Sequence, residues 1–160
     1  MWQIEDVVRA CKFKIETISE YILDKQELSD SDREKLKNWY QDIAQKMQLQ
    51  RIEKSGHLHE VNDVVSEMAV LHMSLLEYYK DEKYESLYKS AEVYLEEFKQ
   101  VSNNPNASSI EIFFNALYAK LILKLQGKDI SSSTDEAFSA FTNVLAYLSA
   151  KYQKMKLGEL

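Results

Sequence analysis

Apolar residues recur at alternating three- and four-residue steps along most of the chain, which is the spacing of one face of an α-helix. The first seam begins at Ile4 and continues to Ile22, within a predicted helix over residues 2–25. No Ser, Thr, Asp or Asn precedes Ile4 to cap this helix, so we expect the native helix to begin upstream of Met1. Later seams predict helices within residues 31–54, 57–79, 84–100, 108–126 and 133–156.

The segment over residues 110–125 is apolar on nearly every side. Its polar side chains, Glu111, Asn115, Lys120 and Lys124, scatter around the helix and form no solvent-facing stripe. A membrane span needs roughly 20 mostly apolar residues, and this run is shorter and carries one Glu and two Lys. We therefore expect the central helix of a bundle, or a helix whose spare face a second copy covers.

Capping and turn residues predict where the helices begin and end. A Ser followed three residues later by a Glu is typical of a capping box, and it predicts helix starts at Ser31, Ser108 and Ser133. Gly56 and Gly127 favour the left-handed conformation that closes a helix. We expect loops near residues 26–31, 55–56, 80–83, 102–108 and 127–133.

Composition supports an all-helical fold. The chain of 160 residues holds only three Gly and one Pro, too few for the many turns of an all-β domain. We predict a single helical-bundle domain over residues 1–160, an all-α bundle of five or six helices in a mostly antiparallel, up-down arrangement.

Charge and cysteine content narrow the classes of partner. The formal net charge of −6 disfavours binding to the nucleic-acid backbone, which requires a clustered positive surface. The single cysteine, Cys11, cannot form an internal disulfide. Glu5 and Asp6 lie where a secretion signal would need a basic and then an apolar segment. We expect a cytoplasmic protein with no membrane contact.

Four stretches match a known pattern: MWQIEDVVRA at residues 1–10, SGHLHEV at 55–61, IEIFFNALYAKLILKLQGKDIS at 110–131 and AYLSAKYQKMK at 146–156. Together they resemble an uncharacterised family of small, all-helical bacterial proteins, known only as a domain of unknown function. Members of that family are longer at the front, with a basic segment and a further helix. The resemblance implies a helical fold and a cytoplasmic setting, and it carries over no activity and no site residue.

The segment HLHEVND holds the densest set of metal-ligating residue types. His59 and Asp63 are four residues apart and share a helix face, but His57 lies about 160° away around the helix. A catalytic zinc site needs three converging protein ligands, so a third would have to come from another helix. The simpler interpretation, which we favour, places these side chains at the solvated start of a helix.

His72 falls in the middle of an apolar seam. An unpaired imidazole buried there would cost about 1–3 kcal/mol, so we expect a hydrogen-bond partner. A Tyr, Asn or Glu of another helix is the favoured partner, ahead of a role for His72 as a metal ligand or catalytic base.

Tyrosine is abundant, with ten residues in the chain and several close together. A tyrosine buries a large ring while its hydroxyl stays in water, so it suits both the boundary of a bundle and a contact surface. We name Tyr78, Tyr84 and Tyr88 as candidates for an interaction surface, but we favour packing at the boundary of the bundle over a dedicated binding face.

The sequence contains no phosphate-binding glycine loop, no CxxC pair and no nucleophile elbow. It therefore names no catalytic residue and no cofactor, and we lean against an enzyme. The leading hypothesis is a non-enzymatic interaction or scaffold module that self-associates or binds an unidentified protein partner. The alternative is a bundle that binds a metal or small ligand near His57, His59 and Asp63, or near His72, with enzymatic activity as one form. A weaker third option is contact with nucleic acid through the lysine-rich C-terminus.

Overall fold

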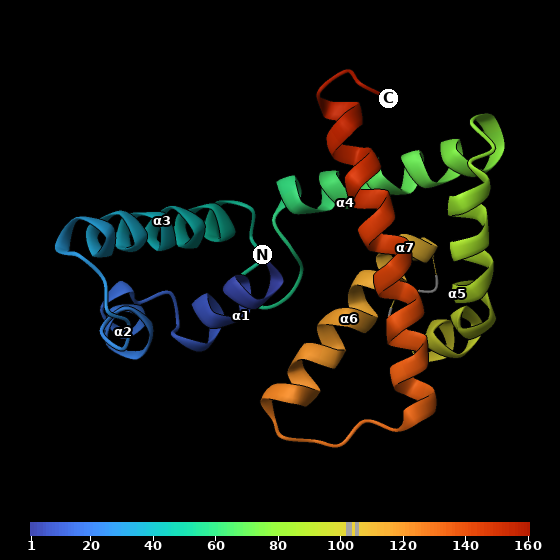
Figure 1. Cartoon of the computed structure of the whole chain (residues 1–160). Helices are drawn as coiled ribbons and strands as arrows, with labels where there is room; N and C mark the ends of the chain where they lie inside the picture. The colour runs from blue at the N-terminus through green and yellow to red at the C-terminus, as the bar shows by residue number, and fades with distance from the viewer. Residues whose placement is uncertain (102–103, 105) are drawn as a thin grey trace. The chain divides into compact units, whose positions relative to one another are not determined.

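The computed structural model describes residues 1–101, 104 and 106–160, and over these residues the chain is all-helical, as predicted, with seven α-helices, two π-helical turns and no strand. In order they are α1 (Trp2–Ala10), α2 (Ile15–Ile18), η1 (Ser19–Leu23), α3 (Asp30–Leu49), α4 (His59–Met73), η2 (Ser74–Tyr78), α5 (Glu82–Val101), α6 (Ser109–Leu125) and α7 (Ser132–Lys156) (Figure 1). The count exceeds the expected five or six because the first predicted helix is broken. The predicted loop at 102–108 lies partly outside the described residues.

The chain divides into two compact units, Met1–Asp63 and Val64–Leu160, and each has its own hydrophobic core. Whether the two units act as the single domain that we expect over residues 1–160 stays a prediction. None of the helices, as far as the structure describes them, combines the length and the apolar character needed to cross a bilayer.

In the first unit, the predicted continuous helix over residues 2–25 is wrong, because the chain reverses at Lys12 and Phe13. Both residues have positive φ angles, 52° and 61°. The Phe13 N–H donates to the Val8 carbonyl at 3.0 Å, which satisfies a carbonyl at the end of α1 without a glycine. The reversal lets α1 and the following turn both pack against α3, around a core that includes Val8.

The ends of α3 also differ from the prediction. Ser29, not Ser31, caps its start: the Asp32 N–H donates to the Ser29 hydroxyl at 3.2 Å. The helix ends at Leu49 and reverses at Arg51, which has a φ of 58°, so Gly56 does not close it. Gly56 instead lies in a longer loop, where its φ of 93° suits a residue without a Cβ.

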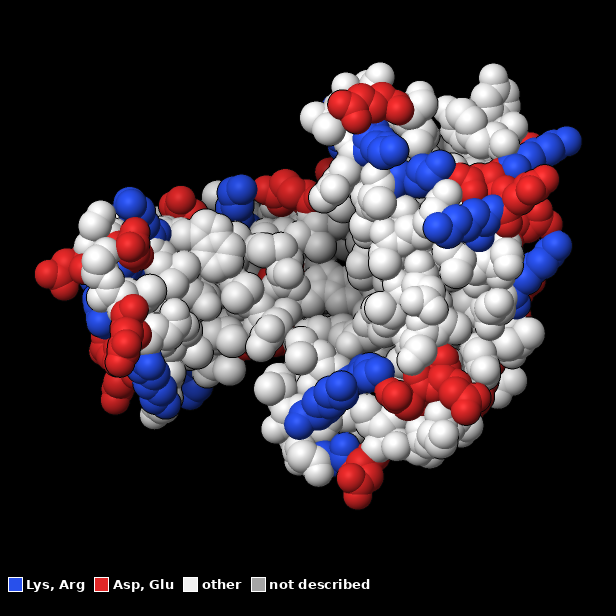
Figure 2. All heavy atoms as spheres, viewed as in Figure 1, with Lys and Arg blue, Asp and Glu red and all other residues white. Residues whose placement is uncertain are grey.

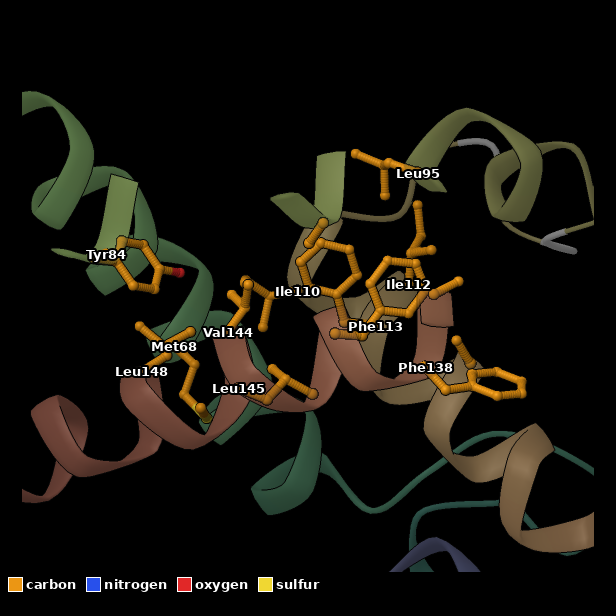
Figure 3. Packing of buried hydrophobic residues seen from close by; sticks show 14 of the residues in the cluster. Met68, Tyr84, Leu95, Ile110, Ile112, Phe113, Phe138, Val144, Leu145 and Leu148 are labelled. Atoms are coloured by element: carbon orange, nitrogen blue, oxygen red, sulfur yellow. The ribbon is translucent and has the colours of Figure 1, made fainter. Parts of the chain in front are cut away.

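An aromatic layer holds the second unit together. Phe113 of α6 stacks on Phe141 of α7 with ring centroids 4.4 Å apart, and the edge of Phe98 of α5 meets Phe141 at 5.0 Å. Figure 3 shows Phe113 beside Val144 and Leu145 of α7, which belong to the same core. The three helices therefore share one core.

The boundaries of α6 follow the prediction at both ends. The Glu111 N–H donates to the Ser108 hydroxyl at 3.1 Å, which confirms the cap. Gly127, with a φ of 66°, ends the helix as expected. At the start of α7, however, the cap is Ser131, whose hydroxyl accepts from the Thr134 N–H, and not Ser133.

The break expected near Asp81 is present. The turn η2 ends at Tyr78, Lys80 reverses the chain with a φ of 48°, and α5 begins at Glu82. Asp81 caps α5, since its carboxylate accepts from the Tyr84 N–H at 3.0 Å.

Charged side chains of both signs are mixed on the face that Figure 2 shows, with uncharged surface between them. Ion pairs such as Lys120–Asp135, at 2.6 Å, link α6 to the first turn of α7. Pairs at the surface contribute at most about 1 kcal/mol each, so the buried cores are the main source of stability.

The position of the α3 cap can be tested with two substitutions. Ser29→Ala removes the acceptor for the Asp32 N–H and should lower the free energy of unfolding by about 1 kcal/mol. Ser31→Ala is the matched control and should cause no loss, because alanine is the better helix former. Urea unfolding of the full chain measures both, and a larger loss for Ser31→Ala would contradict the observed helix start.

Candidate functional site

A buried carboxylate marks the first unit. Glu5, on α1, has no exposed surface. The His57 Nδ1–H donates to its Oε2 at 2.6 Å, and the Leu58 N–H donates to its Oε1 at 3.0 Å. Trp2, one turn earlier on α1, stacks on the His57 ring with centroids 4.4 Å apart. Because Leu58 directly precedes α4, its N–H is among the groups with no acceptor inside the helix, and Glu5 supplies one.

Arg9 holds the same loop from the next turn of α1. Its guanidinium donates to the backbone carbonyls of Ile52 and Gly56, and it pairs with Asp6 at 2.8 Å. Trp2, Glu5 and Arg9, which we call the α1 clamp, are spaced three and four residues apart and so share one helix face. The clamp fixes the loop that precedes α4. Glu5 and Arg9 were not singled out from the sequence, where this shared spacing is the available signal.

The predicted metal-ligating residues do not converge. His57 is held by Glu5, whereas His59 and Asp63 are exposed, and the His59 N–H donates to the Gln50 side chain at 2.8 Å. In the part of the chain that the structure describes, no three His, Cys, Asp or Glu side chains are placed to hold a metal ion together. The alternative hypothesis of a metal or ligand site at these positions gains no support from this geometry.

His72 has the partner that the sequence led us to expect. Its Nδ1 forms a 2.8 Å hydrogen bond with the hydroxyl of Tyr84, and both side chains are buried. Burial lowers the pKa of His72 to about 4 and raises the pKa of Tyr84. Both side chains are therefore neutral near pH 7, which suits a structural hydrogen bond better than proton transfer.

Asp81 joins α5 to α7 beside this pair. Besides capping α5, its carboxylate accepts from the Tyr147 hydroxyl at 3.0 Å and from Lys151 Nζ at 2.8 Å. Burial alone would raise the pKa of Asp81, but the hydrogen bonds from Lys151, the Tyr84 N–H and Tyr147 outweigh it and lower the pKa. The group is thus a charged anchor between two helices.

The three candidate tyrosines have different environments. Tyr84 is fully buried, which corrects its assignment to an interaction surface: its hydroxyl points to His72 inside the core. Tyr88 is half-buried, and its hydroxyl lies 3.2 Å from that of Ser109. Tyr78 is 81% exposed. Of the three, Tyr78 has the exposure that a contact residue requires.

An apolar groove with a volume of about 450 Å³ lies next to Tyr78 in the second unit. It is formed by α4 and η2 on one side and by the end of α7 with the residues that follow it on the other. The lining residues are Ser66, Glu67, Val70, Leu71, Ser74, Tyr79, Met155, Gly158 and Leu160. Tyr79 lines it, and the Tyr79 ring meets the Tyr78 ring edge to face at 5.2 Å. Val70 is 68% exposed at its edge. We call this groove, with the lining residues named above, the α4–α7 groove.

A second groove, of about 680 Å³, lies between α5 and the start of α7. It is more polar, with Ser90, Ser139 and Asn143 among its lining residues. Asp135, also in its lining, is engaged by Lys120, and this bond lowers the pKa of Asp135. The groove thus presents hydroxyl groups, the paired carboxylate of Asp135 and a second carboxylate, Glu136.

The central helix α6 is apolar all round, as the sequence indicated, but the core covers only part of it. Ile110, Phe113 and Ala116 are buried, whereas Leu121 and Leu125 near its C-terminal end are exposed. Exposed leucines on a helix are common singly, so they are weaker signs of a contact than a groove lined on two sides.

A family model described as Domain of unknown function (DUF4924) matches residues 1–159. No curated protein and no solved structure matches the chain.

The role of Glu5 in the α1 clamp predicts a large loss of stability on its removal. Glu5→Ala leaves the His57 ring and the Leu58 N–H without their buried acceptor, and the free energy of unfolding should fall by about 2–4 kcal/mol. Glu5→Gln retains an oxygen that can accept from the Leu58 N–H, so its free energy of unfolding should fall by less. Urea unfolding with Glu20→Ala as the exposed control measures the effect, and equal losses for Ala at positions 5 and 20 would contradict the clamp.

The neutral His72 predicts a pH dependence of stability. Unfolded His72 takes up a proton below its ordinary pKa of 6.5, whereas the folded residue resists protonation until about pH 4. The free energy of unfolding should therefore fall as the pH falls from 6.5 to 4, by about 3 kcal/mol from this residue. The free energy of unfolding, measured at several pH values across this range, should change more with pH for the native chain than for His72→Gln, whose side chain cannot titrate. Identical pH profiles would show that His72 is not buried neutral.

Proposed function

The chain belongs to the family of the domain of unknown function DUF4924, and from that premise we propose that it works through protein contacts, as a non-enzymatic helical module that self-associates. The observation that carries the proposal is the α4–α7 groove with the exposed aromatic residues beside it. Contact surfaces between proteins combine an apolar centre with aromatic side chains and a polar edge, and the groove has all three.

Exposure of the groove to water is unfavourable for the isolated chain. Val70, Tyr78 and Tyr79 are each at least half exposed, and so is Leu157 at the end of α7. Burying one such side chain completely is worth about 1.5–3 kcal/mol, so covering several of them would stabilise a complex substantially. Monomers rarely expose apolar patches larger than a few hundred Å², and such patches mark contact sites.

The titratable groups near the groove support binding over catalysis. Glu67, at its edge, accepts hydrogen bonds from Lys156 and from the Tyr152 hydroxyl, and these lower the pKa of Glu67. A general base is most effective with a pKa near the working pH, and these hydrogen bonds move the pKa of Glu67 away from neutral pH. The carboxylate instead gives the groove a polar edge.

Two further expectations belong to the same proposal. Mostly antiparallel, up-down packing is supported by α6 and α7, which lie side by side and are joined by the short connection over residues 126–131 (Figure 1). A cytoplasmic setting is supported by the single cysteine, Cys11, since proteins of oxidising compartments usually carry disulfides.

Self-association can be measured by sedimentation velocity on the full chain over a range of micromolar concentrations. We expect a species of twice the 18.7 kDa chain mass that grows with concentration. A single species of 18.7 kDa at every concentration would refute self-association.

A further inference from the structure

We infer that the α4–α7 groove receives Tyr78 of a second copy of the chain, so that two copies pair about a two-fold axis with each Tyr78 in the groove of its partner. This inference rests on the proposed function, because it assumes that the chain self-associates. It adds the surface, the residue that is inserted and the symmetry of the pair.

Tyr78 protrudes from the end of a turn whose backbone is fixed. It is the last residue of η2, and it is 81% exposed although it follows a helix whose other face is buried. The Tyr79 N–H donates to the Ser74 carbonyl at 2.8 Å, and Lys80 then reverses the chain with a φ of 48°. The end of the turn is thus fixed by hydrogen bonding, and the Tyr79 ring supports the Tyr78 ring from the side.

The groove suits a tyrosine. Its volume of about 450 Å³ exceeds that of a phenol ring and lies within the range of about 300–1,000 Å³ found for ligand pockets. Val70, Leu71 and Met155 provide apolar contacts for a ring, and the hydroxyl groups of Ser66 and Ser74 lie in the same lining. A buried tyrosine needs an apolar site for its ring and a polar partner for its hydroxyl.

The position of the protruding residue beside the groove argues for a second copy as the occupant. An isologous two-fold interface uses the same patch on both chains, so that patch must be complementary to itself. Tyr78 and the groove lie on one surface, because Tyr79 both lines the groove and contacts the Tyr78 ring. One two-fold rotation therefore permits two equivalent insertions.

The exposed apolar area is close to what a stable dimer requires. Six apolar residues that line the groove or directly adjoin a lining residue in the chain are at least 40% exposed: Val70, Met73, Tyr78, Tyr79, Leu157 and Leu160. If each buries on the order of 100 Å², a copy contributes about 600 Å², compared with about 800 Å² per partner in a standard interface.

Charge at the groove also permits pairing of like chains. The chain has a formal net charge of −6, so two copies repel each other overall. At the edge of the groove, however, Glu67 pairs with Lys156 at 2.6 Å, which leaves this pair without net charge. Glu67 therefore adds little to the repulsion between two acidic chains at this surface.

The test compares four forms of the full chain by sedimentation velocity: native, Tyr78→Asp, Tyr78→Phe and Val93→Asp. Val93, on α5, is 73% exposed and lies outside the groove lining, so it controls for the added charge. Tyr78→Asp should weaken dimerisation by about thirty-fold or more, the effect of removing a central contact residue. Tyr78→Phe and Val93→Asp should dimerise within a few-fold of the native chain. Circular dichroism checks that each variant is folded.

The outcomes separate the two proposals. A native chain that stays monomeric refutes the proposed function and this inference with it. A native dimer that Tyr78→Asp leaves intact, or that Val93→Asp weakens equally, overturns the inference alone and leaves self-association standing.

A photo-crosslinking residue at position 78 supplies a second readout, because it reports which residues lie beside position 78 in the dimer. In a mixture of isotope-labelled and unlabelled chains, we expect crosslinks between copies from position 78 to residues 66–74 or 155–160. Crosslinks between copies that map instead to α6, around Leu121 and Leu125, would overturn the inference and indicate the exposed end of that helix as the interface.

Discussion

The contact between Phe113 and Phe141 is the interaction on which the second unit depends. The two rings are fully buried and stacked, and Phe98 meets Phe141 edge to face, so one aromatic layer joins α5, α6 and α7. Offset and edge-to-face pairs add about 0.5–1.5 kcal/mol each to the burial of the rings. The layer accounts for one apolar face of α6, the face that packs in this core. It also sets the position of α7, whose C-terminal end forms one wall of the α4–α7 groove.

The sequence predicted the features of the fold that have local signals. The all-helical class, the cap at Ser108 and the end of α6 at Gly127 all follow from helix periodicity, serine capping and glycine. The reversals at Lys12, Phe13 and Arg51 could not be predicted, because nothing in these residue types marks a left-handed backbone. At Arg51 the reversal is stabilised by later contacts: the Ile52 N–H donates to the Met47 carbonyl, and both side chains pack in one core.

The candidate site shows the same difference between features with a local sequence signal and features that depend on distant contacts. The need of His72 for a partner was predictable from its place in an apolar seam, and Tyr84 meets it. The acceptor role of Glu5 could not be predicted, because its partners His57 and Leu58 are more than 50 residues away in the chain. The exposure of Tyr78 and the burial of Tyr84 depend on the turn η2 and on the reversal at Lys80, which the seam pattern does not contain. The groove itself exists only once α4 and α7 are packed.

Contact through the α4–α7 groove is the central claim, and hydrogen–deuterium exchange on the unmodified chain tests it most directly. The backbone amides of residues 66–79 and 155–160 should exchange more slowly at high than at low protein concentration, because a second copy covers them, while α5 around Val93 should not change. Protection that does not depend on concentration in the groove segments would contradict the account.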